Sequence, residues 1–158
     1  LGRYAGLRIH ECLRMDTAAA ERALRENALT VKGKGGKVRT VPIEDERILM
    51  MLRKLLAQTE RGHKLLVPDG MPTDRAINAL ELFIYRYRNG ISDEGSDRRL
   101  TFHGLRHTYA AEKYTKLTED SMSAIDAHYA VSRLLGHERA DVTNIYLASV
   151  RKRGRDGE

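Results

Sequence analysis

The sequence predicts an α+β fold that is mainly helical and carries a small antiparallel sheet. Apolar side chains recur at helical spacing over most of the chain, whereas residues 29–43 alternate apolar and polar side chains around a glycine-rich turn. The 158 residues are enough for one domain with one hydrophobic core. We therefore expect a single domain over residues 1–158 that contains one β-hairpin near residues 29–43.

The composition limits the classes of function that fit the chain. Lys and Arg outnumber Asp and Glu by 28 to 22, and the net charge of +6 favours a polyanionic partner without requiring one. A single cysteine, Cys12, excludes an internal disulfide framework and fits a reducing compartment such as the cytoplasm. The sequence has no apolar run of about 18 residues and no apolar leader, so no membrane segment is predicted.

The first part of the chain is expected to form two helices. Residues 3–13 place apolar side chains at rough helical spacing. Residues 17–26 are rich in strong helix formers, and they lie between a capping residue, Asp16 or Thr17, and Asn27, which ends the helix.

The β-hairpin follows these helices. Residues 29–32 and 37–43 both alternate apolar and polar side chains, and Gly35 and Gly36 supply the positive φ values of a tight turn. Pro42 lacks a backbone N–H, so it should end the second strand or lie on a sheet edge.

The rest of the chain is expected to be helical and to be interrupted by loops. Apolar spacing and capping residues predict helices over residues 45–57, from about 73 to 88, over 102–114 after a capping Thr101, and up to Leu135. Gly136 should end the last of these helices. A surface loop is expected over residues 89–100, and a short final helix from about residue 141 should carry Tyr146.

Six side chains are candidates for function, because folding alone does not require their chemistry: Arg8, Lys34, His103, Arg106, His137 and Tyr146. Each has a simpler explanation when considered separately. Arg8 has Glu11 three residues away as an ion-pair partner, and a lysine at the tip of a hairpin is commonly only solvated. His137 fits the cap of a helix end, and Tyr146 fits a half-buried packing position.

Metal and nucleotide sites are less well supported by the sequence. His103 and His107 are four residues apart, which suits zinc, but the Glu of the H-E-x-x-H motif is missing and Cys12 is distant in sequence. The segment G-K-G-G-K differs from a phosphate-binding loop, because Val38 follows the lysine and a strand begins there. No acidic cluster suited to Mg²⁺ is apparent, so we expect no metal and no cofactor.

Four motifs, in this order, give the chain a resemblance to the catalytic domain of the tyrosine recombinase (phage integrase) family. A-G-L-R-I-H-E is similar to the first family motif, T-G-L-R-x-S-E, and this places the first catalytic arginine at Arg8. V-K-G-K-G-G-K-V-R-T-V-P-I resembles the family hairpin and places the catalytic lysine at Lys34.

The other two motifs lie in the second half of the chain. H-G-L-R-H-T-Y-A is similar to the family motif H-x-L-R-H, with its histidine at His103 and its second arginine at Arg106. L-L-G-H with a tyrosine nine residues later resembles the last motif, which gives His137 and the nucleophile Tyr146. The chain begins at the first motif, so we expect an N-terminally truncated protein without the family's DNA-clamping domain.

The resemblance implies site-specific DNA recombination without a metal ion or ATP. Tyr146 would attack a phosphodiester and form a 3′-phosphotyrosyl intermediate, which a 5′-hydroxyl of a second strand then resolves. The residues expected to contact double-stranded DNA are Arg8, Lys34, Lys37, Arg39, Arg106 and His137. The resemblance also implies a cytoplasmic protein of a bacterium, phage or mobile element that forms a homotetramer on DNA, and we expect a monomer without DNA.

Three other functions stay open at this point. The same residues would serve a type IB topoisomerase, which relaxes supercoils without exchanging partners. The chain would also fit a DNA-binding fragment with weak catalytic activity. A zinc-dependent hydrolase that uses His103, His107 and His137 is the third alternative.

Overall fold

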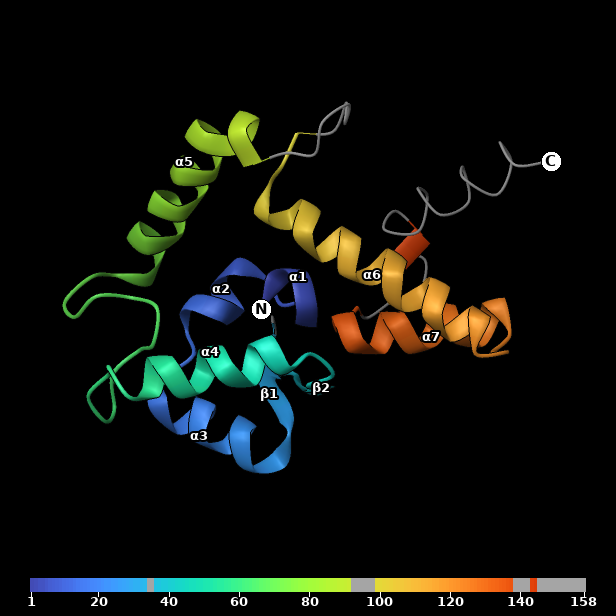
Figure 1. The fold of residues 1–158 in the computed structure, drawn as a ribbon, viewed down its shortest axis with the longest axis horizontal. Coiled ribbons are helices and arrows are strands. Elements are labelled where there is room, and N and C mark those ends of the chain that lie inside the picture. Colours follow the sequence, from blue (N-terminus) through green and yellow to red (C-terminus); the bar gives the residue numbers. More distant parts are fainter. Residues whose placement is uncertain (34–35, 92–98, 138–142, 145–158) are drawn as a thin grey trace.

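A computed structural model describes residues 1–33, 36–91, 99–137 and 143–144 (Figure 1). The elements in chain order are α1 (Gly2–Ala5), α2 (Ile9–Leu13), α3 (Thr17–Glu26), β1 (Ala28–Lys32), β2 (Val38–Pro42), α4 (Glu46–Leu56), α5 (Thr73–Ile91), α6 (Phe102–Glu119) and α7 (Ala124–Leu135). This mainly helical architecture with one small sheet confirms the predicted α+β class.

The β-hairpin forms where the alternation predicted it. β1 and β2 pair antiparallel, with Thr30 opposite Thr40, and they make a two-stranded sheet over the residues described. Gly36 has a φ of 79°, as the tight turn requires, and β2 ends at Pro42. The segment after Asp16 is the helix α3, as its strong helix formers predicted.

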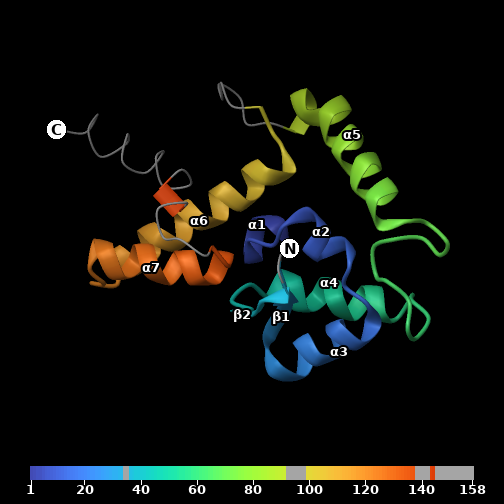
Figure 2. The ribbon, with the colours of Figure 1, turned by 180° about the vertical axis from the view of Figure 1, so that it is seen from behind.

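α1 and α2 lie in the middle of the molecule, and the other elements lie around them (Figures 1 and 2). α3, α4 and the hairpin lie on one side and share the largest hydrophobic core with α1 and α2. α6 packs on α1, and α7 runs beside α6 and reaches β2. α5 packs on α2 through a smaller cluster and projects away from the rest.

The first helical segment differs from its prediction. Residues 3–13 are not one helix, because the backbone at Gly6 turns into the left-handed region with φ 62° and ψ 25°. A Cβ at this position would overlap the ring of Tyr109 and would lie 3.2 Å from a methyl carbon of Leu135. The close approach of α1 to α6 and α7 therefore requires glycine, and it moves Arg8 from a helix interior to the N-cap of α2.

The predicted capping residues set the start of α6 and the end of α7, the two helices that carry the last two motifs. The Thr101 side chain accepts a hydrogen bond from the Gly104 backbone N–H at the start of α6, which continues past the predicted end at Tyr114 to Glu119. α7 ends at Gly136, whose φ of 64° and ψ of 45° make a left-handed cap. The N–H of His137 then donates to the carbonyl of Ser132 at 3.1 Å, so the backbone at His137 is fixed by the helix end.

None of the helices in the described ranges combines the length and the apolar character needed to cross a lipid bilayer.

Candidate active site

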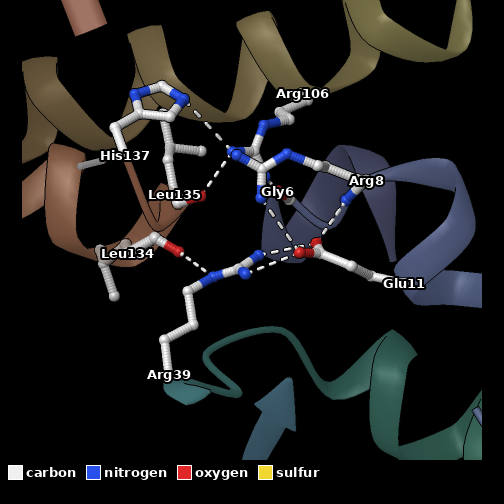
Figure 3. Close-up of polar contacts among 8 residues, drawn as sticks. All are labelled: Gly6, Arg8, Glu11, Arg39, Arg106, Leu134, Leu135 and His137. Atoms are coloured by element: carbon white, nitrogen blue, oxygen red, sulfur yellow. Dashed lines mark hydrogen bonds and ion pairs between the residues drawn. The ribbon is translucent and has the colours of Figure 1, made fainter. Parts of the chain in front are cut away.

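The guanidinium of Arg106 lies at the centre of the site, and the residue is only 1% exposed. Its Nη1 donates to the carbonyl of Gly6, and its Nη2 donates to the carbonyl of Leu135 at 2.5 Å (Figure 3). These two acceptors come from the ends of α1 and α7. Arg106 therefore joins α6 to α7 and to α1, which is about 100 positions away in sequence, and its charge lies where the three helices meet.

His137 lies directly beside this guanidinium. The Nε2 atom of His137 is 3.4 Å from Nη2 of Arg106, and the Nδ1 atom is 2.8 Å from the hydroxyl of Thr143 (Figure 3 draws the first contact). Loss of hydration, followed by the positive charges of Arg106, Arg8 and Arg39 and by His103, lowers the pKa of His137 to about 4. His137 is therefore a neutral imidazole at neutral pH.

A buried carboxylate, Glu11, connects the other two arginines of the site. Arg39 donates from Nη1 and Nη2 to the two oxygens of Glu11, at 2.7 Å each, and Arg8 donates from its backbone N–H at 2.7 Å and from Nη1 at 3.1 Å. Burial alone would raise the pKa of Glu11. However, the hydrogen bonds from Arg39 and from the Arg8 backbone, and then the charges of both arginines, lower it to about 2.

The C-terminal end of α7 is held by two of these arginines. Arg39 donates from Nε to the carbonyl of Leu134 at 2.8 Å, and Arg106 donates to the next carbonyl, that of Leu135 (Figure 3). The last carbonyls of a helix have no partner within the helix and carry its negative dipole end, so guanidinium donors stabilise them. This capping fixes the residue that follows, His137, relative to β2 and α6.

His103 and His107 lie on α6, near Arg106 in sequence. Their rings are in edge-to-face contact, with centroids 4.7 Å apart. Loss of hydration and the charges of Arg106 and Arg8 lower the pKa of His103. Within the described residues, no three His, Cys, Asp or Glu side chains are arranged to hold a metal ion.

The structure brings together part of the predicted site. Arg8, Arg106 and His137 converge (Figure 3). After the loss of hydration, the charges of Arg106 and Arg8 also lower the pKa of His103. The expected ion pair between Arg8 and Glu11 is also present, so the simpler explanation of Arg8 holds together with its place in the site. Lys34 and Tyr146 lie outside the described residues.

The two remaining predicted DNA contacts differ in exposure. Lys37 is exposed, next to the hairpin turn. The Arg39 side chain is only 11% exposed, and its guanidinium donates to Glu11 and Leu134. The structure thus gives Arg39 an internal role that its position in a basic hairpin did not indicate.

Sequence reasoning missed the two residues that hold the site in place. Glu11 was considered only as a neighbour of Arg8, although its carboxylate also binds Arg39, 28 positions further along the chain. Thr143 was not singled out, and its partner His137 is six positions away. The spacing of apolar residues gives no signal for either contact, because both join polar side chains.

The chain is similar to known proteins in sequence and in fold. The sequence model of the phage integrase family matches residues 1–153. Tyrosine recombinase XerD of Pseudomonas putida is 28% identical over 148 residues, a match that covers 89% of this chain and 45% of XerD.

Solved structures share the fold. XerA recombinase superposes with a TM-score of 0.65 at 22% identity, covering 98% of this chain and 54% of XerA. The Tn1549 transposon integrase in complex with a circular intermediate DNA gives a TM-score of 0.61 at 17% identity, covering 98% of this chain and 56% of the integrase. The chain therefore spans about half the length of the proteins that it matches.

Proposed function

The chain belongs to the phage integrase family, and from this membership we propose that it is a site-specific DNA recombinase or integrase. The observation that supports this most is the convergence of Arg8, Arg106 and His137 at the end of α7. Three cationic or hydrogen-bonding groups at one point suit a phosphate, and among the similar structures the Tn1549 integrase is in complex with DNA.

The proposed reaction begins with an attack on a DNA phosphodiester. The phenol oxygen of Tyr146 forms a bond to phosphorus, the bond from phosphorus to the 5′ oxygen breaks, and a 3′-phosphotyrosyl bond results. His103 accepts the phenolic proton or hydrogen-bonds the phosphate, and Lys34 gives a proton to the leaving 5′ oxygen. Because the phosphodiester bond is exchanged and not hydrolysed, the step needs no ATP. The two arginines, the lysine and the two histidines take the place of the divalent metal that many phosphoryl-transfer enzymes use.

The remaining groups stabilise the charge that develops on the non-bridging oxygens. Arg8 and Arg106 are always protonated and present planar pairs of donors. Donors fixed in place in this way commonly contribute about 3–4 kcal/mol each to a transition state. His137, neutral at neutral pH, donates one N–H to the phosphate. Lys37 contacts the DNA backbone, and Arg39 reaches it only with donors beyond those that bind Glu11 and Leu134.

A nicked duplex tests this proposal, because loss of the short strand beyond the nick traps the covalent intermediate. The wild-type chain should form a protein–DNA adduct that survives denaturing electrophoresis, with and without a chelator, and Tyr146→Phe should form none. An adduct that persists in Tyr146→Phe would show that the nucleophile is wrong. Adduct formation that is lost in chelator would favour zinc-dependent chemistry.

Assays on the same purified protein distinguish a recombinase from two alternatives, a type IB topoisomerase and a DNA-binding fragment. A type IB topoisomerase would relax supercoiled DNA without joining two marked duplexes, whereas a recombinase exchanges their strands. A DNA-binding fragment would bind DNA and form no adduct. We propose a monomer without DNA and a homotetramer on DNA, and sedimentation of a stable tetramer in the absence of DNA would contradict this.

A further inference from the structure

The ring of His137 is held between two partners of different kind. On one side, Nε2 is 3.4 Å from the guanidinium of Arg106, and on the other side Nδ1 is 2.8 Å from the hydroxyl of Thr143. Thr143 is fully buried, so water does not compete for this hydroxyl. The His137 backbone is already fixed by the left-handed turn at Gly136, and the contact with Thr143 then fixes the rotation of the ring.

We propose that Thr143 is a positioning residue for His137, and that its hydroxyl holds Nδ1 so that Nε2 faces Arg106 and the phosphate expected beside it. This inference rests on the proposed function, because the phosphate belongs to that reaction. Thr143 itself is three positions before the proposed nucleophile Tyr146. No contact between Thr143 and the substrate is required.

The chemistry of the three groups determines where the proton of the imidazole lies. A guanidinium N–H only donates, so in its contact with Arg106 the Nε2 atom of His137 has to accept. A neutral imidazole carries one proton, so Nδ1 then carries it and donates to the Thr143 hydroxyl. The neutral state follows first from the loss of hydration on burial. The charges around the ring add to it, and they come from Arg106 and His103 on α6, Arg8 at the start of α2, and Arg39 on β2.

A phosphate beside Arg106 reverses which imidazole nitrogen of His137 has to carry the proton. A phosphate oxygen accepts, so Nε2 has to carry the proton and Nδ1 has to accept. A threonine hydroxyl both donates and accepts, and it rotates to suit its partner, so Thr143 supports His137 in either form. A backbone carbonyl would only accept and would favour the form that cannot donate from Nε2. Thr143 therefore suits a histidine that exchanges its proton between nitrogens when DNA binds.

Two variants separate the hydroxyl from the rest of the side chain. Thr143→Val keeps the shape and removes the hydroxyl, whereas Thr143→Ser keeps the hydroxyl. Removing the hydrogen-bond partner behind a functional histidine commonly costs about 10–100-fold in metal sites, and we expect a similar loss in the rate of adduct formation for Thr143→Val. Thr143→Ser should stay within about threefold of wild type, because its hydroxyl rescues the contact.

The ratio of the two His137 tautomers, measured by ¹⁵N NMR on the protein without DNA, distinguishes positioning from a general structural role. The form protonated at Nδ1 should dominate in wild type and Thr143→Ser, and should decrease in Thr143→Val. The rate of adduct formation should also be no lower in the His137→Gln, Thr143→Val double variant than in His137→Gln alone.

Three results would overturn the inference: an unchanged tautomer ratio in Thr143→Val, a rate equal to wild type in that variant, or a further loss of rate in the double variant. If the wild-type chain forms no adduct, the proposed function fails. The tautomer ratio then decides by itself whether Thr143 orients His137, so the two failures are distinguishable.

Discussion

Arg39 and Glu11 form an ion pair with two hydrogen bonds of 2.7 Å, and it joins the β-hairpin to the start of α2. The Glu11 side chain has no exposed surface, and the Arg39 side chain is 11% exposed. The same guanidinium caps α7 through the carbonyl of Leu134, and Glu11 also binds Arg8. One buried carboxylate therefore sets the relative positions of Arg8 and of the helix that leads to His137.

The Glu11 carboxylate should make the stability of the fold depend on pH in the acid range. Its pKa is lowered from 4.5 to about 2, so the charged form is favoured in the folded state. The resulting stability is fully present above about pH 5, and it is lost as the pH falls toward 2, by roughly 3 kcal/mol in total. Urea unfolding between pH 2 and 6 measures this.

Glu11→Gln is the matched variant for that experiment. It should be less stable than wild type at pH 6, and the difference should shrink as the pH falls through the range in which Glu11 is protonated. A difference that stays constant with pH would show that the charge of Glu11 contributes nothing to the ion pair.

Arg39→Lys should slow adduct formation without changing the salt dependence of DNA binding. A lysine cannot form two parallel bonds to Glu11 and a third to Leu134. We expect adduct formation to slow by about 10-fold to 100-fold, because the groups around the phosphate are misplaced. Noncovalent binding, measured in the Tyr146→Phe background, should keep the same slope of log affinity against log salt.

Lys37→Gln is the control for this prediction. Lys37 is exposed beside the same turn, and if it contacts a phosphate, its loss should reduce the salt slope by about 1. A similar reduction for a neutral variant, Arg39→Gln, would assign Arg39 to DNA binding and not to positioning.

Gly136→Ala should destabilise the site. The φ of 64° costs a non-glycine residue about 1–2 kcal/mol. In addition, the new Cβ would lie 2.9 Å from Cδ of Arg39. Gly70→Ala is the control, because its φ of 74° is similar and no atom lies within 4 Å of its Cβ position. Thermal unfolding should show a larger loss for Gly136→Ala, and equal losses would contradict the contact with Arg39.

The pKa values of His137 and His63 should be shifted in opposite directions from the ordinary value, and NMR measures each of them separately. His137, with its pKa lowered to about 4, should stay neutral until well below pH 6. Because its folded pKa lies below the ordinary 6.5, its contribution to stability is present above pH 6.5 and is lost as the pH falls toward 4.

His63 provides the contrast in the same spectra. Its pKa is raised by the hydrogen bond and charge of Asp69, so it should titrate above 6.5, and Asp69→Asn should bring it down. A His137 that titrates above His63 would contradict the burial of the imidazole and its proximity to the three arginines.

The sequence predicted those parts of the fold that depend on local rules. Thr101 and Gly136 delimit helices through side-chain capping and a left-handed turn, and both were identifiable from neighbouring residues. The break at Gly6 was missed, because its cause is the ring of Tyr109 on another helix. Glycine within an apolar segment gives no indication of what packs against it.

The site was predictable as a set of residues, but not as a set of contacts. Motif spacing identified Arg8, Arg106 and His137, which the structure brings together. It gave no indication that Glu11 binds Arg39 or that Thr143 reaches His137, since the motifs record residue types and not side-chain contacts. Such contacts depend on tertiary packing, which residue patterns along one element do not encode.

The position of the covalent bond tests the central claim most directly. The adduct trapped on a nicked duplex is digested with protease and nuclease, and mass spectrometry locates the nucleotide on one of the seven tyrosines. We predict a 3′-phosphate linked to Tyr146 and a free 5′-hydroxyl on the released strand. A bond to any other residue, or a linkage to a 5′-phosphate, would contradict the account.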